Sequence, residues 1–250
     1  MTLPGPEVFE RASLAAWPGI EVEWDASWVR RAANGYTKRA NSVQPLDPAD
    51  DADAEARILA AAGWYGARGL RAVVRLTPLA GPRVVAALDR LGWRAVDASR
   101  LFAMALAATD PDPHGVALDV RDPRFLAAQQ ELHGYSEAQR AGLAAVLAVL
   151  EVPAAGLVLH APDGTVVASA LMSIADGIVV TGNVIVAAAA RRRGHGAALM
   201  RTGLAWARGQ GARLAALNVA AGNRGAQALY RSLGYRHQYD YGYRVPGAAP

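Results

Sequence analysis

The chain has 250 residues, of which 52% are hydrophobic and 19% are charged, and its net charge is +4 at neutral pH. This composition predicts a folded globular protein, and the absence of cysteine excludes disulfides, cysteine metal sites and a thiol nucleophile. The positive charge does not favour a nucleic-acid partner, because Lys38 is the only lysine and the arginines are spread along the whole chain.

In the first half of the chain, the pattern of apolar and turn-forming residues predicts helices that alternate with strands. Residues 1–16 favour a helix, and the alternating pattern of residues 20–24 predicts a half-exposed strand. Residues 36–43 form a polar segment that is typical of a strand or turn. The elements predicted next are a helix over 53–67, a strand over 71–76, a helix over 82–91 opened by Pro82, and one or two strands over 94–106.

The second half begins after a polar, proline-rich linker at residues 109–113. Residues 166–190 are apolar enough to suggest a membrane helix, but Asp176 and Gly177 divide them into two strands of a hairpin. The elements predicted around this hairpin are strands over 116–120, 157–159 and 213–219, helices over 125–134 and 137–150, further helices beginning near 197 and 223, a last strand, and a frayed end at 247–250.

The two halves resemble each other at a fixed offset of 142 residues. The shift carries Trp64 onto Trp206, Gly69 onto Gly211, and Leu91-Gly92-Trp93-Arg94 onto Leu233-Gly234-Tyr235-Arg236 without a gap. Elements of the same type also follow in the same order. We therefore predict a tandem duplication, with a first domain over 1–108, a linker over 109–113 and a second domain over 114–250.

A glycine-containing loop joins a strand ending at Val186 to the next helix. Glycines let successive backbone N–H groups turn toward one point at the positive end of a helix, where arginines add charge. The loop therefore predicts a phosphate or pyrophosphate site, although Leu199 departs from a dinucleotide fingerprint and no Gly-Lys-Ser/Thr follows. Its residues are Arg191, Arg192, Arg193, Gly194, His195, Gly196 and Ala197.

Two ordered motifs carry a family resemblance. The pattern Arg191-x-x-Gly194-x-Gly196 resembles the coenzyme A pyrophosphate loop of GCN5-related N-acetyltransferases (GNAT enzymes). The downstream pattern Asn223-x-x-Ala226-x-x-Leu229-Tyr230-x-x-Leu233-Gly234-Tyr235 resembles the second signature of that family. The resemblance covers about residues 115–245. It implies an α/β fold with a mixed, mostly antiparallel sheet and helices on both faces.

The tandem arrangement implies that the first copy is degenerate. Positions 49–54 align with the loop but carry three aspartates and no glycine, so we expect the first domain to bind no coenzyme A. The segment from Tyr36 to Asn41 resembles a Gly-Tyr-Thr-x-Arg-Ala-Asn-Ser motif of some tandem bacterial acetyltransferases, one group of which is histone-acetyltransferase-like. Within it, Arg39 and Asn41 are candidates for contacts to the acceptor.

The resemblance implies acetyl transfer from acetyl-CoA to a primary amine, by direct transfer in a ternary complex and without a metal. Residues 191–197 would hold the pyrophosphate, while Ile185, Val186 and Asn223 would hold the pantetheine arm. Tyr230 would lie near the sulfur and act as an acid. The general base stays open, because ordered water can also remove the proton; the candidates are Glu131, His133, Glu137, Asp176 and Asp240.

Other functions remain as alternatives. A transferase resembling mycothiol synthase would act on a different amine, and a CoA-binding regulatory or scaffold protein would have no turnover. A serine hydrolase is not supported, since no G-x-S-x-G occurs, and the five histidines fall at no metal-ligand spacing. The first residues lack the pattern of a signal peptide, so we expect a cytoplasmic protein without membrane association. The acceptor, the acyl-chain preference and the oligomeric state cannot be read from the sequence.

Overall fold

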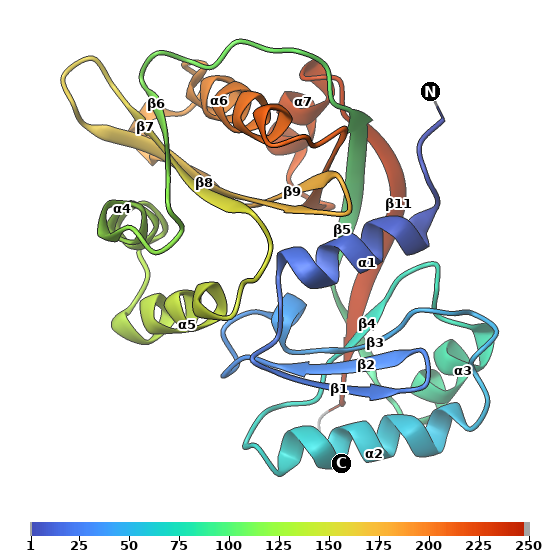
Figure 1. The fold of residues 1–250 in the computed structure, drawn as a ribbon. Coiled ribbons are helices and arrows are strands. Elements are labelled where there is room, and N and C mark those ends of the chain that lie inside the picture. The colour runs from blue at the N-terminus through green and yellow to red at the C-terminus, as the bar shows by residue number, and fades with distance from the viewer. Residues whose placement is uncertain (1, 248–250) are drawn as a thin grey trace.

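One continuous mixed sheet runs through both halves of the chain in the computed structural model, which describes residues 2–247 (Figure 1). Among these residues the sheet has eleven strands, in the order β1-β2-β3-β4-β11-β5-β10-β9-β8-β7-β6. The strands are β1 Glu21–Asp25, β2 Trp28–Ala32, β3 Val43–Pro45, β4 Val74–Leu76, β5 Arg94–Ala105, β6 Gly115–Leu118, β7 Ala154–His160, β8 Val166–Ala175, β9 Ile178–Val186, β10 Leu214–Ala220 and β11 Arg236–Val245.

Helices cover both faces of this sheet. Those that pack on one face are α2 Ala54–Gly66, α3 Pro82–Arg90, α6 His195–Gly209 and α7 Arg224–Ser232, and those on the other are α1 Pro6–Ala16, α4 Pro123–His133 and α5 Glu137–Ala148. Two short 3-10 helices are η1 Lys38–Ala40 and η2 Ala188–Ala190. This architecture confirms the predicted fold class. The fraying predicted for residues 247–250 falls largely outside the described residues.

The apolar stretch of residues 166–190 forms a hairpin, as its central Asp176-Gly177 pair predicts. Both turn residues have a positive φ, 51° at Asp176 and 73° at Gly177. Strands β8 and β9 pair antiparallel on either side of them. No helix within residues 2–247 is both long enough and apolar enough to cross a membrane.

The offset of 142 residues also holds in three dimensions. It carries the first residues of α3 and β5 onto those of α7 and β11. Gly69 and Gly211 have φ values of 65° and 88°, and Gly92 and Gly234 have values of 68° and 97°. These left-handed conformations favour glycine, so the shared glycines mark turns of the same shape.

Strands β5 and β11 lie side by side at the centre of the sheet, and each borders the other half of the chain. β5 pairs with β10, and β11 pairs with β4. Arg94 of β5 pairs with Val245 of β11, and Ala103 of β5 pairs with Arg236 of β11. The 142-residue offset relates Arg94 to Arg236 and Ala103 to Val245, so exchanging the two strands turns one pair into the other. The two strands are thus related by an approximate two-fold axis. The division into domains at residues 109–113 stays a prediction, because the sheet continues across both halves.

Candidate active site

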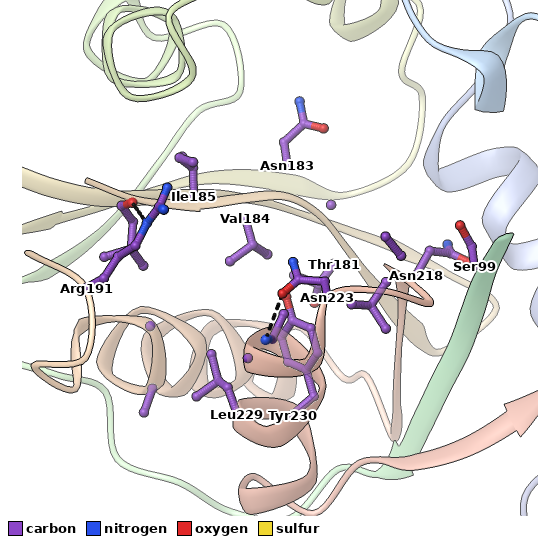
Figure 2. Close-up of a pocket in the computed structure, with 18 of the residues that line it drawn as sticks. Ser99, Thr181, Asn183, Val184, Ile185, Arg191, Asn218, Asn223, Leu229 and Tyr230 are labelled. Atoms are coloured by element: carbon purple, nitrogen blue, oxygen red, sulfur yellow. Dashed lines mark hydrogen bonds between the residues drawn. The ribbon is translucent and has the colours of Figure 1, made fainter. Parts of the chain in front are cut away.

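A pocket of about 840 Å³ opens where β9 and β10 separate (Figure 2). These parallel strands are paired only from Ile178 and Leu214 to Thr181 and Leu217. Beyond that point a bulge at Asn183, whose φ is 50°, shifts the register of β9 against β8. The edge of β9 from residue 182 to 186 therefore has no partner strand on the β10 side, and it lines the pocket.

The loop of residues 191–197 closes one end of the pocket. Arg192 and Gly194 have φ values of 61° and 86°, and α6 begins at His195 with no side-chain cap and no acid in its first turn. Within the described chain, no acceptor binds the backbone N–H groups of residues 192–197. The loop thus offers unpaired donors at the positive end of a helix. Arg193 is not among the residues that line the pocket, although the rest of the loop is.

Close packing fixes this loop against its neighbours. A Cβ on Gly196 would lie 2.9 Å from Leu229 Cδ2 and 3.7 Å from Val186 Cγ2, so glycine lets α6 approach α7 and β9 closely. Arg191 Nε donates to the carbonyl oxygen of Val186 at 3.2 Å. The start of α6 is therefore tied to the open edge of β9.

Asn223 and Tyr230 lie together on the wall opposite β9 (Figure 2). The side-chain oxygen of Asn223 accepts from the N–H of Ala226 at 3.1 Å and caps α7, while the residue also lines the pocket. Tyr230 is 6% exposed, and its ring packs edge-on against Tyr235. Burial raises the pKa of Tyr230 to about 12, so its hydroxyl keeps its proton at neutral pH.

The first half of the chain also contributes to the pocket. Arg39 lines it and donates from Nη2 to the side-chain oxygen of Asn183 at 3.3 Å. Asn41, the other candidate for acceptor contacts, is not among the lining residues. Its side-chain oxygen accepts from the N–H groups of Ala33 and Gly35 at 2.7 and 2.9 Å, which holds the preceding turn. The structure brings Arg39 to the pocket but leaves Asn41 inside the fold.

Sequence reasoning missed Asp97, the one carboxylate among the described residues that line the pocket. A bulge in β5 opposite Gly242 gives Asp97 a φ of 51°, and Lys38 Nζ lies 2.6 Å from its carboxylate. No signal in the sequence distinguishes this acid, because the bulge that directs it arises from pairing with β11, far along the chain.

The five candidate bases do not line the pocket. Asp240 is paired with Arg100 and His237, and Glu137 with Arg140. His133 contacts a residue that lines the pocket, since its Nε2 lies 3.4 Å from the carbonyl oxygen of Asn183. Burial lowers the pKa of His133 below its ordinary value.

The corresponding loop in the first half, residues 49–54, carries carboxylates that bind other groups of the protein. Asp50 accepts hydrogen bonds from Ser27 Oγ at 2.7 Å and from Arg57 Nη1 at 2.8 Å. The hydrogen bonds from Arg57, followed by those from Ser27, lower the pKa of Asp50 to about 2. Asp51 accepts from the N–H of Arg83 at 3.0 Å, in the first turn of α3. The carboxylates of this loop therefore have donors within the protein as their partners.

These features agree with comparisons to known proteins. The chain matches the family described as "Probable histone acetyltransferase Rv0428c C-terminal" over residues 7–244. It belongs to this acetyltransferase family. This membership, together with the N-acetyltransferase relative and the GNAT folds described below, confirms the prediction of a GNAT-type N-acetyltransferase.

Relatives of this acetyltransferase family member differ in how much of the chain they match. It is 40% identical to the "Probable histone acetyltransferase Rv0428c" of Mycobacterium tuberculosis over 62 residues, which are 25% of this chain and 20% of that protein. The chain thus matches about one fifth of that relative. It is 24% identical over 242 residues to the "Uncharacterized N-acetyltransferase YobR" of Bacillus subtilis, covering 94% of this chain and 96% of that one.

Solved structures share the fold. A GCN5-related N-acetyltransferase from Kribbella flavida has a TM-score of 0.73 and 20% identity, over 99% of this chain and 98% of that chain. A tandem GNAT protein from the clavulanic acid biosynthesis pathway has a TM-score of 0.61 and 15% identity, over 84% of this chain and 76% of that chain. At these identities the likeness concerns the fold alone.

Proposed function

We propose that this protein transfers the acetyl group of acetyl-CoA directly to a primary amine, with both substrates bound together in the 840 Å³ pocket. The observation that carries the proposal is the loop of residues 191–197. Its unpaired N–H groups and two lining arginines lie beside the open edge of β9. Donors of this kind at a helix N-terminus suit a pyrophosphate.

The residues present fit coenzyme A along the length of the pocket. The 191–197 loop would bind the pyrophosphate, with Arg191 already held against the end of β9. The unpartnered edge of β9 at Ile185 and Val186 would exchange backbone hydrogen bonds with the pantetheine amides. Asn223, at the start of α7, and Tyr230, on that helix, face this edge (Figure 2). The Tyr230 hydroxyl would lie near the sulfur of the bound thioester.

When bound, acetyl-CoA supplies a thioester whose acetyl carbon bonds to the amine nitrogen while its C–S bond breaks and CoA leaves as a thiolate. The backbone N–H groups on the open edge of β9 would stabilise the charge that develops on the carbonyl oxygen. The Tyr230 hydroxyl would hydrogen-bond to the leaving sulfur and donate its proton. With the five candidate bases outside the pocket and the lining carboxylate of Asp97 paired with Lys38, the amine would lose its proton through ordered water.

Two alternatives make different predictions for turnover. A regulatory or scaffold protein would bind CoA and release no thiol, whereas a transferase resembling mycothiol synthase would act on an amino-sugar conjugate. The buried hydroxyl of Tyr230 inside the pocket favours catalysis over binding alone.

The test is a thiol-release assay with acetyl-CoA and a panel of primary amines, alongside calorimetry with CoA. We expect saturable CoA binding and thiol release that depends on the amine. CoA binding without release for any amine, including an amino-sugar conjugate, would favour the scaffold, and absence of CoA binding would reject the proposal.

A further inference from the structure

Arg39 carries a positive charge that the protein does not neutralise. Its guanidinium lies against β9 where the strands separate: a Cβ on Gly182 would be 3.5 Å from Nη1, and Nη2 donates to Asn183. Figure 2 shows Arg191 and Ser99 at opposite ends of the pocket. Arg39 contacts β9 near its middle, away from the 191–197 loop, and it lines the pocket together with Ser99.

The position of Arg39 is fixed from several sides. The buried guanidinium of Arg31 donates to the backbone carbonyl of Arg39 and, at 2.9 Å, to that of Trp17. The Trp17 ring lies under the Arg39 guanidinium, 4.8 Å from ring centroid to Cζ. A charged group held in this way loses little conformational entropy when it binds a ligand.

Most hydrogen-bonding capacity of Arg39 is unused. A guanidinium has five N–H donors, and the structure gives this one a single acceptor, Asn183 Oδ1, among residues 2–247. No carboxylate in that part of the chain lies within ion-pair distance of Arg39. Lys38, the neighbouring cation in the pocket, is by contrast paired with Asp97 at 2.6 Å.

Buried charges behind Arg39 add to the positive potential. Arg31 and Arg75 are 4% and 2% exposed, and the one carboxylate buried with them, Glu10, pairs with Arg75 at 2.9 Å. Burial, followed by the charge of Arg75, lowers the pKa of Arg31 to about 10, and it is still a cation at neutral pH. This end of the pocket therefore repels cations and attracts anions.

We propose that Arg39 binds an anionic group on the acceptor, so that the acceptor is a small amine that also carries a carboxylate or a phosphate. The planar guanidinium can donate two parallel hydrogen bonds to either group. A lysine-rich peptide would bring further positive charge to a region that already has an excess of it. This inference rests on the proposed function and specifies its substrate class.

The experiment compares amines in matched pairs. One pair is an α-amino acid and its decarboxylated amine, a second is phosphoethanolamine and ethanolamine, and a lysine-rich peptide is the competing candidate. We expect wild type to show a kcat/KM about 10- to 100-fold higher for the anionic member of a pair, the range of a charge-assisted hydrogen bond. The pair that shows the preference distinguishes carboxylate from phosphate. Arg39→Gln should remove the preference by raising the KM for the acceptor, while the KM for acetyl-CoA stays unchanged.

A control variant and a binding measurement make the outcome decisive. Arg90→Gln removes one positive charge from the exposed surface of α3 and should keep the wild-type preference. The same amines are also titrated into the CoA-loaded protein, so binding is read even where no product forms. Arg39-dependent binding without turnover would leave the anion site standing and reject the proposed function. Equal use of neutral and anionic amines, better use of the lysine-rich peptide, or an unchanged preference in Arg39→Gln would overturn the anion site.

Discussion

Asp50 forms an ion pair of 2.8 Å with Arg57 of α2, and it lies in the loop of the first half that corresponds to residues 191–196 of the second. Arg57 also reaches Asp25 at 2.9 Å, and Asp51 binds the first turn of α3. The corresponding loop has thus kept its place before a helix, but its carboxylates are bound by cationic and N–H groups of the protein. We therefore expect the two loops to differ in the charge of the ligand that they bind.

The first prediction follows from this difference. One acetyl-CoA should bind per chain, because carboxylates at Asp50 and Asp51 would repel a pyrophosphate in the first half. Calorimetric titration with CoA should give a stoichiometry of one, and Gly194→Val should reduce it to zero. A stoichiometry of two, or one site that survives in Gly194→Val, would show that the first half binds the cofactor.

The second prediction concerns Gly194 itself. A Cβ at this residue would meet no protein atom within 4 Å, so the constraint is its φ of 86° and the space that a ligand would need. Valine in this left-handed conformation costs about 1–3 kcal/mol and would turn the neighbouring N–H groups away from their common point. We expect Gly194→Val to abolish measurable CoA binding in calorimetry.

Gly69 provides the matched control for that variant. Its φ is 65° and a Cβ there would also meet nothing within 4 Å, but it lies in the turn after α2, outside the pocket. Gly69→Val should lose a similar amount of stability in thermal unfolding and keep its CoA affinity. Equal loss of affinity in both variants would attribute the effect to general destabilisation.

Local patterns were sufficient to predict most of the helices and strands. The hairpin turn at Asp176 and Gly177 and the glycine turns at Gly92 and Gly234 are encoded by neighbouring residues, so sequence reasoning could find them. The position of β5 between β10 and β11 depends on pairing between residues that lie more than 100 positions apart in the sequence. Asp97 reaches the pocket only through that pairing, and for this reason the sequence could not indicate it.

The third prediction concerns the buried pair of Glu10 and Arg75, which joins α1 to β4. Glu10 Oε1 lies 2.9 Å from Arg75 Nη2, and it also accepts from the Tyr239 hydroxyl of β11 at 2.6 Å. Burial alone would raise the pKa of Glu10, but the charge and hydrogen bonds of Arg75 outweigh it and lower this pKa. Glu10→Gln leaves Arg75 uncompensated and should reduce the free energy of unfolding by about 3–5 kcal/mol at pH 7.

The dependence on pH gives this prediction a second readout. Because the pKa of Glu10 is lower in the folded state than its ordinary value of 4.5, the stabilisation is fully present above that value and is lost as the pH falls below it. Urea unfolding should therefore show the gap between wild type and Glu10→Gln narrowing below about pH 4.5. Glu7→Gln, on the exposed side of the same helix, should change stability by less than about 1 kcal/mol at any pH.

The last prediction concerns the hydroxyl of Tyr230. A pKa of about 12 keeps it protonated throughout the neutral range, so it can donate a hydrogen bond there but gives up its proton less readily than an exposed tyrosine. Full transfer of this proton to a free thiolate is energetically unfavourable, because the corresponding thiol has a pKa of only about 8.5. The same burial would raise the pKa of a thiolate beside Tyr230 and reduce this difference. The hydroxyl therefore suits a leaving group that acquires charge inside the pocket.

Tyr230→Phe deletes the hydroxyl and keeps the ring that packs against Tyr235. If the hydroxyl assists departure of CoA, kcat should fall by about 10²- to 10⁴-fold while the Kd for CoA changes little, because the interaction acts in the transition state. Tyr235→Phe is the control, since Tyr235 is buried beneath Tyr230 and does not line the pocket. It should retain near-normal kcat. A Tyr230→Phe variant with kcat as high as that control would assign Tyr230 to the hydrophobic core, and departure of CoA would then depend on water.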